Sequence, residues 1–321
     1  MALPDVLRDS LRLPIMGSPM FIVSGPELVI AQCKAGIVGA FPALNARPQA
    51  ALAEWITRIK DELAAFAADN PDKKVAPFAV NQICHTTNER LRADVETCVE
   101  HEVPIIITSL RPPEDVVKAV HSYGGVVFHD IISQRHAEKA AEQDVDGLIL
   151  VCAGAGGHAG PLSPFALLRE VKEWFEGTII LSGAISDGWC VASARALGAD
   201  LAYMGSRFIA TEEANAQSAY KQMLIDSAAK DVIYTPFFTG VAGSYLKPSI
   251  VKAGLDPDAL SAPTDKGMNF AGRKDNEAKA WVDVWGSGQG IGTIHDTPPV
   301  AELVDRIEAE YGEARAQLTA S

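Results

Sequence analysis

The stretch 147-GLILVCAGAGGHAG-160 decides the fold of this chain. Its first six residues form a continuous apolar run, which is typical of a parallel strand that is buried on both faces. The run ends in a segment of glycine and alanine that surrounds a single histidine, His158. Main chain this bare allows a flat or phosphorylated ligand to approach closely. The stretch therefore predicts a buried strand that ends at a ligand-binding loop.

Seven more apolar runs share this character, at 14–16, 36–41, 78–83, 104–110, 126–131, 178–183 and 201–206. Amphipathic helical patterns separate them, at 25–35, 48–68, 88–102, 113–122, 133–143, 164–175 and 187–197. Capping residues support several of these helices, with Ser133, Asp187 and Asn88 as predicted N-caps. Eight alternations of strand and helix predict an α/β fold of the (β/α)8 TIM barrel type, and a doubly wound parallel sheet is the competing architecture.

The pattern changes after the eighth strand, which suggests three segments. Residues 1–212 form the predicted barrel, and 213–285 form a predicted insertion, mainly helical, that covers one end of it. This insertion begins with a helix-like run at 213–230 and continues in a tract rich in proline and glycine. Residues 286–321 are expected to form a return loop and a C-terminal amphipathic helix that packs on the barrel.

Composition excludes several classes of function. The chain of 321 residues is 48% hydrophobic and 21% charged, as in a globular enzyme. Its formal net charge of −13 disfavours nucleic acid and anionic membranes as partners. The five cysteines are scattered without CxxC spacing, so neither a disulfide framework nor a metal site is predicted, and a cytoplasmic location is favoured. No signal peptide or membrane span is predicted.

Active sites in barrels of this type lie at the carboxyl ends of the strands, and the loops after strands seven and eight frequently hold a phosphate. Here these loops begin with Gly183 and with Gly205-Ser206. Glycine lets main-chain N–H groups approach an anion, and the serine adds a hydroxyl donor. A phosphorylated cofactor such as FMN fits this arrangement, since small residues at other strand ends leave room for its ring.

Several segments together resemble the nitronate monooxygenase family, formerly called 2-nitropropane dioxygenase, which is related to flavin-dependent enoyl reductases. They are 14-PIM-16, Asn81, 151-VCAGAGGHAG-160, 181-LSGAISDG-188, 203-YMGSRFIATEEA-214 and 286-GSGQGIG-292. The resemblance implies a barrel that binds FMN without a metal. It also implies roles for individual residues: Asn81, Gly156 and Gly183 would contact the flavin, Tyr203, Met204, Gly205 and Ser206 would hold its phosphate end, and His158 would face the substrate as the catalytic base.

A histidine is suited to removing a proton from carbon next to a nitro group, because its pKa lies near neutrality. His158 is therefore the predicted catalytic residue. The pair His129-Asp130 ends a strand, where it either positions His158 or a substrate oxygen or has a structural role. Cys152 is interpreted as a small core residue rather than a nucleophile.

Three functions remain open from the sequence. The first is an FMN-dependent monooxygenase that oxidises nitronates or nitroalkanes with O2 to carbonyl compounds and nitrite. The second is an NAD(P)H-dependent FMN reductase on the same scaffold, acting on a quinone or an enoyl thioester. The third is a binding protein that has lost catalysis. A small-molecule substrate and O2 are the predicted partners, a homo-oligomer is compatible with the sequence, and no residue specifies the physiological substrate.

Overall fold

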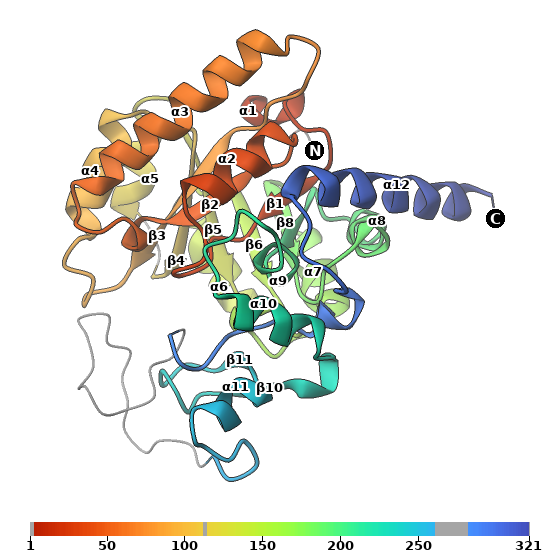
Figure 1. Cartoon of the computed structure of the whole chain (residues 1–321). Helices are drawn as coiled ribbons and strands as arrows, with labels where there is room; N and C mark the ends of the chain where they lie inside the picture. Colours follow the sequence, from red (N-terminus) through yellow and green to blue (C-terminus); the bar gives the residue numbers. More distant parts are fainter. Residues whose placement is uncertain (1–2, 112–113, 261–281, 321) are drawn as a thin grey trace.

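Eight parallel strands form a barrel in the computed structural model, which describes residues 3–111, 114–260 and 282–320 (Figure 1). The strands are β1 (Ile15–Gly17), β2 (Gly39–Pro42), β3 (Phe78–Cys84), β4 (Ile105–Leu110), β5 (Val126–Ile131), β6 (Gly147–Val151), β8 (Thr178–Ser182) and β9 (Leu201–Met204). Their order is β1-β9-β8-β6-β5-β4-β3-β2. The ring closes where Gly17 N–H donates to the Val38 carbonyl at 2.7 Å. This closure confirms the TIM barrel and excludes the doubly wound sheet.

Helices follow the strands at all seven predicted places. They are α2 (Pro26–Lys34), α3 (Ala51–Asp69), α4 (Leu91–Glu100), α5 (Glu114–His121), α6 (Gln134–Ala141), α7 (Pro164–Lys172) and α8 (Gly188–Leu197). Ser133 and Asp187 cap α6 and α8 as predicted, each accepting from a main-chain N–H of the first turn. The prediction for Asn88 was wrong, because α4 begins only after Arg90 and the Asn88 side chain instead accepts from the Arg90 N–H.

The alternation of side chains along each strand divides the core in two. One cluster fills the barrel interior with residues such as Met16, Ile107 and Phe128, and α1 (Asp5–Arg8) adds Leu7 to it. The other cluster lies between the strands and the surrounding helices. The same alternation turns Asn81, Ser109 and Asp130 inward at the carboxyl ends of β3, β4 and β5.

The segment after β9 lies at the end of the barrel opposite to α1 (Figure 1). It contains α9 (Ser206–Ile209), α10 (Ser218–Ile225), η2 (Ala229–Asp231), β10 (Val232–Thr235), β11 (Gly243–Leu246) and α11 (Lys247–Lys252). The helix expected over 213–230 is thus short, and an antiparallel hairpin, β10–β11, was not predicted. Strands of four residues are too short to give a clear alternation of polar and apolar residues. Part of the predicted insertion, 261–281, lies outside the described residues.

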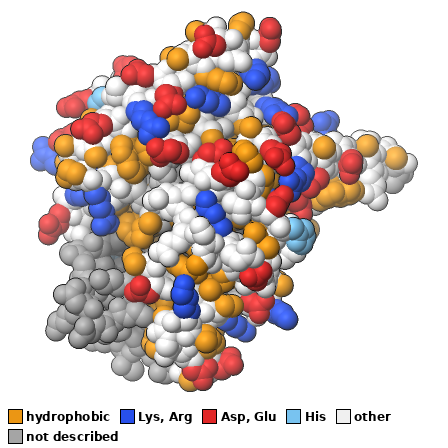
Figure 2. Space-filling view, in the orientation of Figure 1, with side chains coloured by type: hydrophobic (Ala, Val, Ile, Leu, Met, Phe, Trp, Pro, Cys, Tyr) orange, Lys and Arg blue, Asp and Glu red, His pale blue; other side chains and the backbone are white. Residues whose placement is uncertain are grey.

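The hairpin joins the barrel through β7 (Gly157–His158), which pairs antiparallel with β11. The chain then returns through η3 (Gln289–Thr293) to α12 (Val300–Thr319), which packs on α8 and α2. On the molecular face in Figure 2, acidic and basic side chains are interspersed over the barrel helices. Among the described residues, no helix is long and apolar enough to span a membrane.

The contact between α8 and α12 depends on Gly188. A Cβ at this position would lie within 3 Å of the main chain of Ile307 and Tyr311. We therefore expect Gly188→Ala to lower the free energy of unfolding by about 1–3 kcal/mol through overpacking. Gly312, inside α12, is a matched control because a Cβ there meets nothing within 4 Å. Gly312→Ala should stabilise the protein by about 0.5–1 kcal/mol. Equal effects of the two variants in denaturant titrations would contradict this view of the interface.

Candidate active site

Four segments meet at the carboxyl end of the barrel. They are the loop after β6, the loops after β8 and β9, and the return loop at 286–290. Gly154 lies at their centre, because its carbonyl accepts from the N–H of Ala184 at 3.1 Å and from that of Gln289 at 2.9 Å. The Ser206 hydroxyl accepts from the N–H of Gly288 at 2.8 Å. The return loop is thus hydrogen-bonded to the loops after β6 and β9. The loop after β8 is hydrogen-bonded to Gly154, which also accepts from the return loop.

Main-chain packing explains why the β6 loop carries so few side chains. A Cβ on Gly156 would lie 2.7 Å from Gly288 N, and one on Gly183 would lie 2.8 Å from the Ala153 carbonyl oxygen. Gly183 also has a φ of +135°, which other residues rarely adopt. The bare segment therefore accommodates the chain's own return loop. Contact of Gly156 and Gly183 with a flavin stays a prediction.

His158 lies in a strand, not in an open loop. Its partner in β11 is Gly243, and Tyr234 Oη donates to the neighbouring Ala159 carbonyl at 2.7 Å. The Nε2 atom of His158 lies 2.7 Å from Thr239 Oγ1, whose hydroxyl donates to the Val241 carbonyl at 3.0 Å. Because the Thr239 hydroxyl proton is directed to the Val241 carbonyl, Thr239 Oγ1 accepts a hydrogen bond from His158. The ring proton therefore lies on Nε2, and Nδ1 carries the lone pair. Burial lowers the pKa of His158 to about 4, so the ring is neutral at neutral pH.

A polar cluster lies inside the barrel below this loop. Asn81 Nδ2 donates to Ser109 Oγ at 2.9 Å, and Ser109 Oγ donates to Asp130 Oδ2 at 2.6 Å. Burial raises the pKa of Asp130 to about 7, although the hydrogen bond from Ser109 acts to lower it. The Tyr203 ring packs in the barrel interior, and burial followed by the charge of Asp130 raises its pKa well above the usual value. Sequence reasoning missed this cluster, although the inward register of the strands contains it.

Contact of Tyr203 and Met204 with a phosphate stays a prediction, and the structure shows where their side chains lie. The Tyr203 ring packs in the barrel interior. The Met204 side chain is fully buried between the strands and the helices, so only its main chain is available to a ligand in the barrel mouth. Both positions follow from alternation along β9. Gly205 and Ser206 do lie at the mouth, where a Cβ on Gly205 would approach Ser18 and Met20 at 3.3 and 3.8 Å.

The remaining sequence candidates have structural positions. His129 points outward from β5, where its Nδ1 lies 2.8 Å from Thr108 Oγ1, and burial lowers its pKa to about 4. It therefore faces away from the barrel mouth. Cys152 is fully buried, and burial raises the pKa of its thiol to about 12, in keeping with a core residue. No three metal-ligating side chains cluster in the part of the chain that the structure describes.

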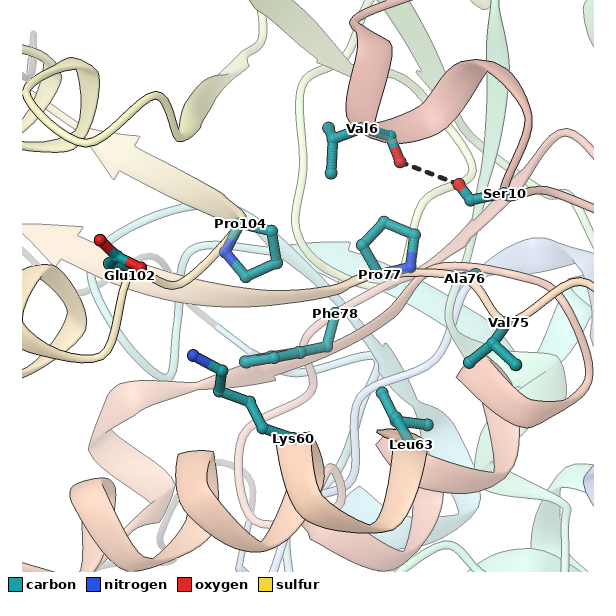
Figure 3. A pocket seen from close by; sticks show the side chains of 10 residues that line it. All are labelled: Val6, Ser10, Lys60, Leu63, Val75, Ala76, Pro77, Phe78, Glu102 and Pro104. Carbon is teal, nitrogen blue, oxygen red and sulfur yellow. Dashed lines mark hydrogen bonds between the residues drawn. The ribbon is translucent and has the colours of Figure 1, made fainter. Parts of the chain in front are cut away.

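A hollow of about 420 Å³ lies at the other end of the barrel (Figure 3). Apolar side chains line most of it, including Val6, Leu63 and Phe78, with Lys60 and Glu102 at its sides. It lies next to the amino-terminal ends of β3 and β4 and contains none of the candidate residues.

A family model described as nitronate monooxygenase matches residues 8–310 of this chain. The chain belongs to the nitronate monooxygenase family. It is therefore an oxidoreductase by family, and the resemblance seen in the sequence is confirmed.

The relatives described below are named as a nitronate monooxygenase and as a CoA dehydrogenase. A nitronate monooxygenase from Paraburkholderia phytofirmans is 25% identical, over 95% of this chain and 94% of its own length. Also 25% identical, over 92% of each chain, is (3aS,4S,5R,7aS)-5-hydroxy-7a-methyl-1-oxo-octahydro-1H-indene-4-carboxyl-CoA dehydrogenase from Rhodococcus jostii.

Solved structures share the fold at low sequence identity. A nitroalkane oxidase from Streptomyces ansochromogenes superposes with a TM-score of 0.77 at 21% identity, covering 98% of this chain and all of that one. FabK from Thermotoga maritima gives a TM-score of 0.76 at 22% identity, covering 98% and 97%.

The lowered pKa of the half-buried His158 should make stability depend on pH. An unfolded histidine has a pKa of about 6.5, whereas that of His158 in the folded protein is lowered to about 4. The unfolded chain therefore binds more protons between these values, so the cost of the buried neutral ring grows as pH falls through this window. We therefore compare the free energies of unfolding of the wild type and of His158→Gln, measured in denaturant. The advantage of the wild type should become smaller as pH falls from about 7 to 5.

The exposed His295 supplies the control. The His295→Gln variant controls for the replacement itself, and the pH dependence of the His158→Gln difference is read relative to it. If the difference in unfolding free energy between His158→Gln and the wild type does not change with pH relative to this control, a neutral His158 in the folded protein is contradicted.

Proposed function

We propose that this chain is an FMN-dependent oxidoreductase that oxidises nitronates or nitroalkanes with O2 to carbonyl compounds and nitrite. Family membership supports the class of reaction. The observation that carries the proposal is the neutral imidazole of His158, fixed at the barrel mouth by β11 and Thr239. A base in a fixed position beside a barrel mouth suits proton transfer from a small substrate.

The residues at the mouth fit FMN in two respects. Buried oxygens of Tyr203 and Asp130 have no hydrogen-bond partner, as expected where a polar ring edge binds. Gly205 and Ser206, where α9 begins, are partly exposed, as a phosphate site there requires. Gly183, Gly205 and Ser206 would hold the phosphate, and Asn81 and Gly156 would contact the ring. FMN, when bound, would supply the electron transfer from substrate to O2.

The low pKa of His158 favours nitronates over neutral nitroalkanes. Removal of a carbon-bound proton by a base with a pKa of about 4 is unfavourable, whereas a nitronate has already lost that proton. With a nitronate, the reaction would then need no proton transfer to His158. With a neutral nitroalkane, the Nδ1 atom would accept the proton.

The second candidate is an NAD(P)H-dependent flavin enzyme that acts on a quinone or a thioester. The Rhodococcus relative, named as a CoA dehydrogenase, favours it, because the match covers 92% of both chains. Mixing the purified protein with NADH in the absence of O2 separates the two. Persistent flavin absorbance supports the monooxygenase, and rapid bleaching supports the second candidate.

Replacement of His158 tests the proposed function directly. A positioned base contributes about 10²–10⁴-fold to a rate, so His158→Ala should slow turnover of a neutral nitroalkane by this factor. The loss with the matching nitronate should be smaller, since no proton is removed. Oxygen uptake with both substrates at neutral pH measures the difference. The FMN content should stay unchanged, and His295→Ala should behave as the wild type. Unaltered turnover of both substrates by His158→Ala would remove this residue from the reaction.

A further inference from the structure

Four polar side chains form the floor of the barrel mouth. Asn81, Ser109, Asp130 and Tyr203 project inward from β3, β4, β5 and β9, above apolar layers that include Ile107 and Phe128. Polar groups in such a place are normally hydrogen-bonded. Here, however, two oxygens of the cluster have no protein partner.

The hydrogen bonds of the cluster have a defined direction. Asn81 Nδ2 can only donate, so Ser109 Oγ accepts from it and gives its own proton to Asp130 Oδ2. Oδ2 is therefore an acceptor. Oδ1 of the same carboxyl is buried and has no hydrogen-bond partner. When Asp130 is protonated, the proton consequently resides on Oδ1, which becomes a donor.

Tyr203 supplies the second unpartnered oxygen. The residue is 6% exposed, and its buried Oη makes no hydrogen bond of good geometry with a described residue, although Ser18 lies near enough to lower its pKa. Asp130 and Ser18 are the polar groups that influence its pKa. A phenylalanine would fill the same apolar space at no cost in buried polarity. The hydroxyl is thus a donor that packing does not require.

No cation compensates the Asp130 carboxyl among the described residues that influence it. Ser109 is the hydrogen-bonding neighbour on β4, Tyr203 is the titratable group on β9, and His129 on β5 points away toward Thr108. The neighbouring β6 contributes apolar residues, such as Ile149. Burial without a cation favours the neutral carboxylic acid, in agreement with a pKa raised to about 7.

We propose that the Tyr203 hydroxyl and the carboxylic acid of Asp130 form a pair of hydrogen-bond donors that binds one carbonyl oxygen of the molecule in the barrel mouth. The inference rests on the proposed function, in which this oxygen belongs to the flavin ring. The two groups lie close enough for the charge of Asp130 to raise the pKa of Tyr203. Two donors that project into one buried site can bind a partly negative oxygen strongly. Ionisation of Asp130 replaces one donor by a carboxylate, which repels the same oxygen.

Binding of a flavin should therefore weaken as pH rises through about 7. If only the protein with neutral Asp130 binds well, the apparent Kd of the wild type increases by about 10- to 30-fold between about pH 6 and 8.5. Riboflavin is the preferred probe, because it lacks the phosphate of FMN, whose own second ionisation lies near pH 6. Titrations use the full chain freed of flavin and follow quenching of flavin fluorescence.

Variants separate the two donors. Asp130→Asn keeps a donor at every pH, so its Kd should stay within about twofold of the wild-type value at low pH over the whole range. Asp130→Ala should bind weakly at every pH. Tyr203→Phe should weaken binding by about 3- to 10-fold and keep the pH dependence. Asp115→Asn, on the exposed surface of α5, is the matched control and should behave as the wild type.

Each possible result of these titrations either supports or overturns the inference. A wild-type Kd that is independent of pH, or that falls as pH rises, overturns the donor role of Asp130, as does the same pH dependence in Asp130→Asn. Either result leaves the proposed function in place, provided that FMN binds. Failure of the wild type to bind either FMN or riboflavin overturns both this inference and the proposed function.

Discussion

The active end of this barrel depends on close main-chain contact between the return loop at 286–290 and the glycine-rich loop after β6. Gly154 accepts hydrogen bonds from Ala184 and Gln289, and Gly156 packs directly on Gly288. Because this contact leaves no space for a Cβ, it requires glycine on the β6 side. The contact links residues that are more than 130 positions apart and brings β11 beside β7. The sheet that holds His158 is also bonded to this returning segment, since Leu246 N–H donates to the Trp285 carbonyl at 2.9 Å and Ser287 N–H to the Ser244 carbonyl at 3.2 Å.

Burial then determines the chemistry of the groups at the mouth. Burial lowers the pKa of His158 to about 4 and raises the pKa of Asp130 to about 7, so it favours the neutral form of each group. Below about pH 7, a neutral imidazole beside the mouth and a neutral carboxylic acid on its floor make a site with little charge of its own. Such a site suits a cofactor that is neutral at its ring.

The sequence predicted the barrel well, because eight buried parallel strands produce continuous apolar runs separated by amphipathic helices. It also located His158 and the glycine loops. It did not predict the β10–β11 hairpin, since its strands are short and β7 has only two residues. The roles of Tyr203, Met204 and His129 depend on which side of a strand each residue faces. A continuous apolar run does not reveal this, so the inward cluster of Asn81, Ser109, Asp130 and Tyr203 emerged only from the register.

A crystal structure of the full chain with FMN tests the central claim most directly. The account predicts the phosphate between the loops that follow β8 and β9, a carbonyl edge of the ring directed toward Asp130 and Tyr203, and the His158 imidazole facing the ring. FMN bound outside the barrel mouth, or a His158 ring directed away from the flavin, would contradict it.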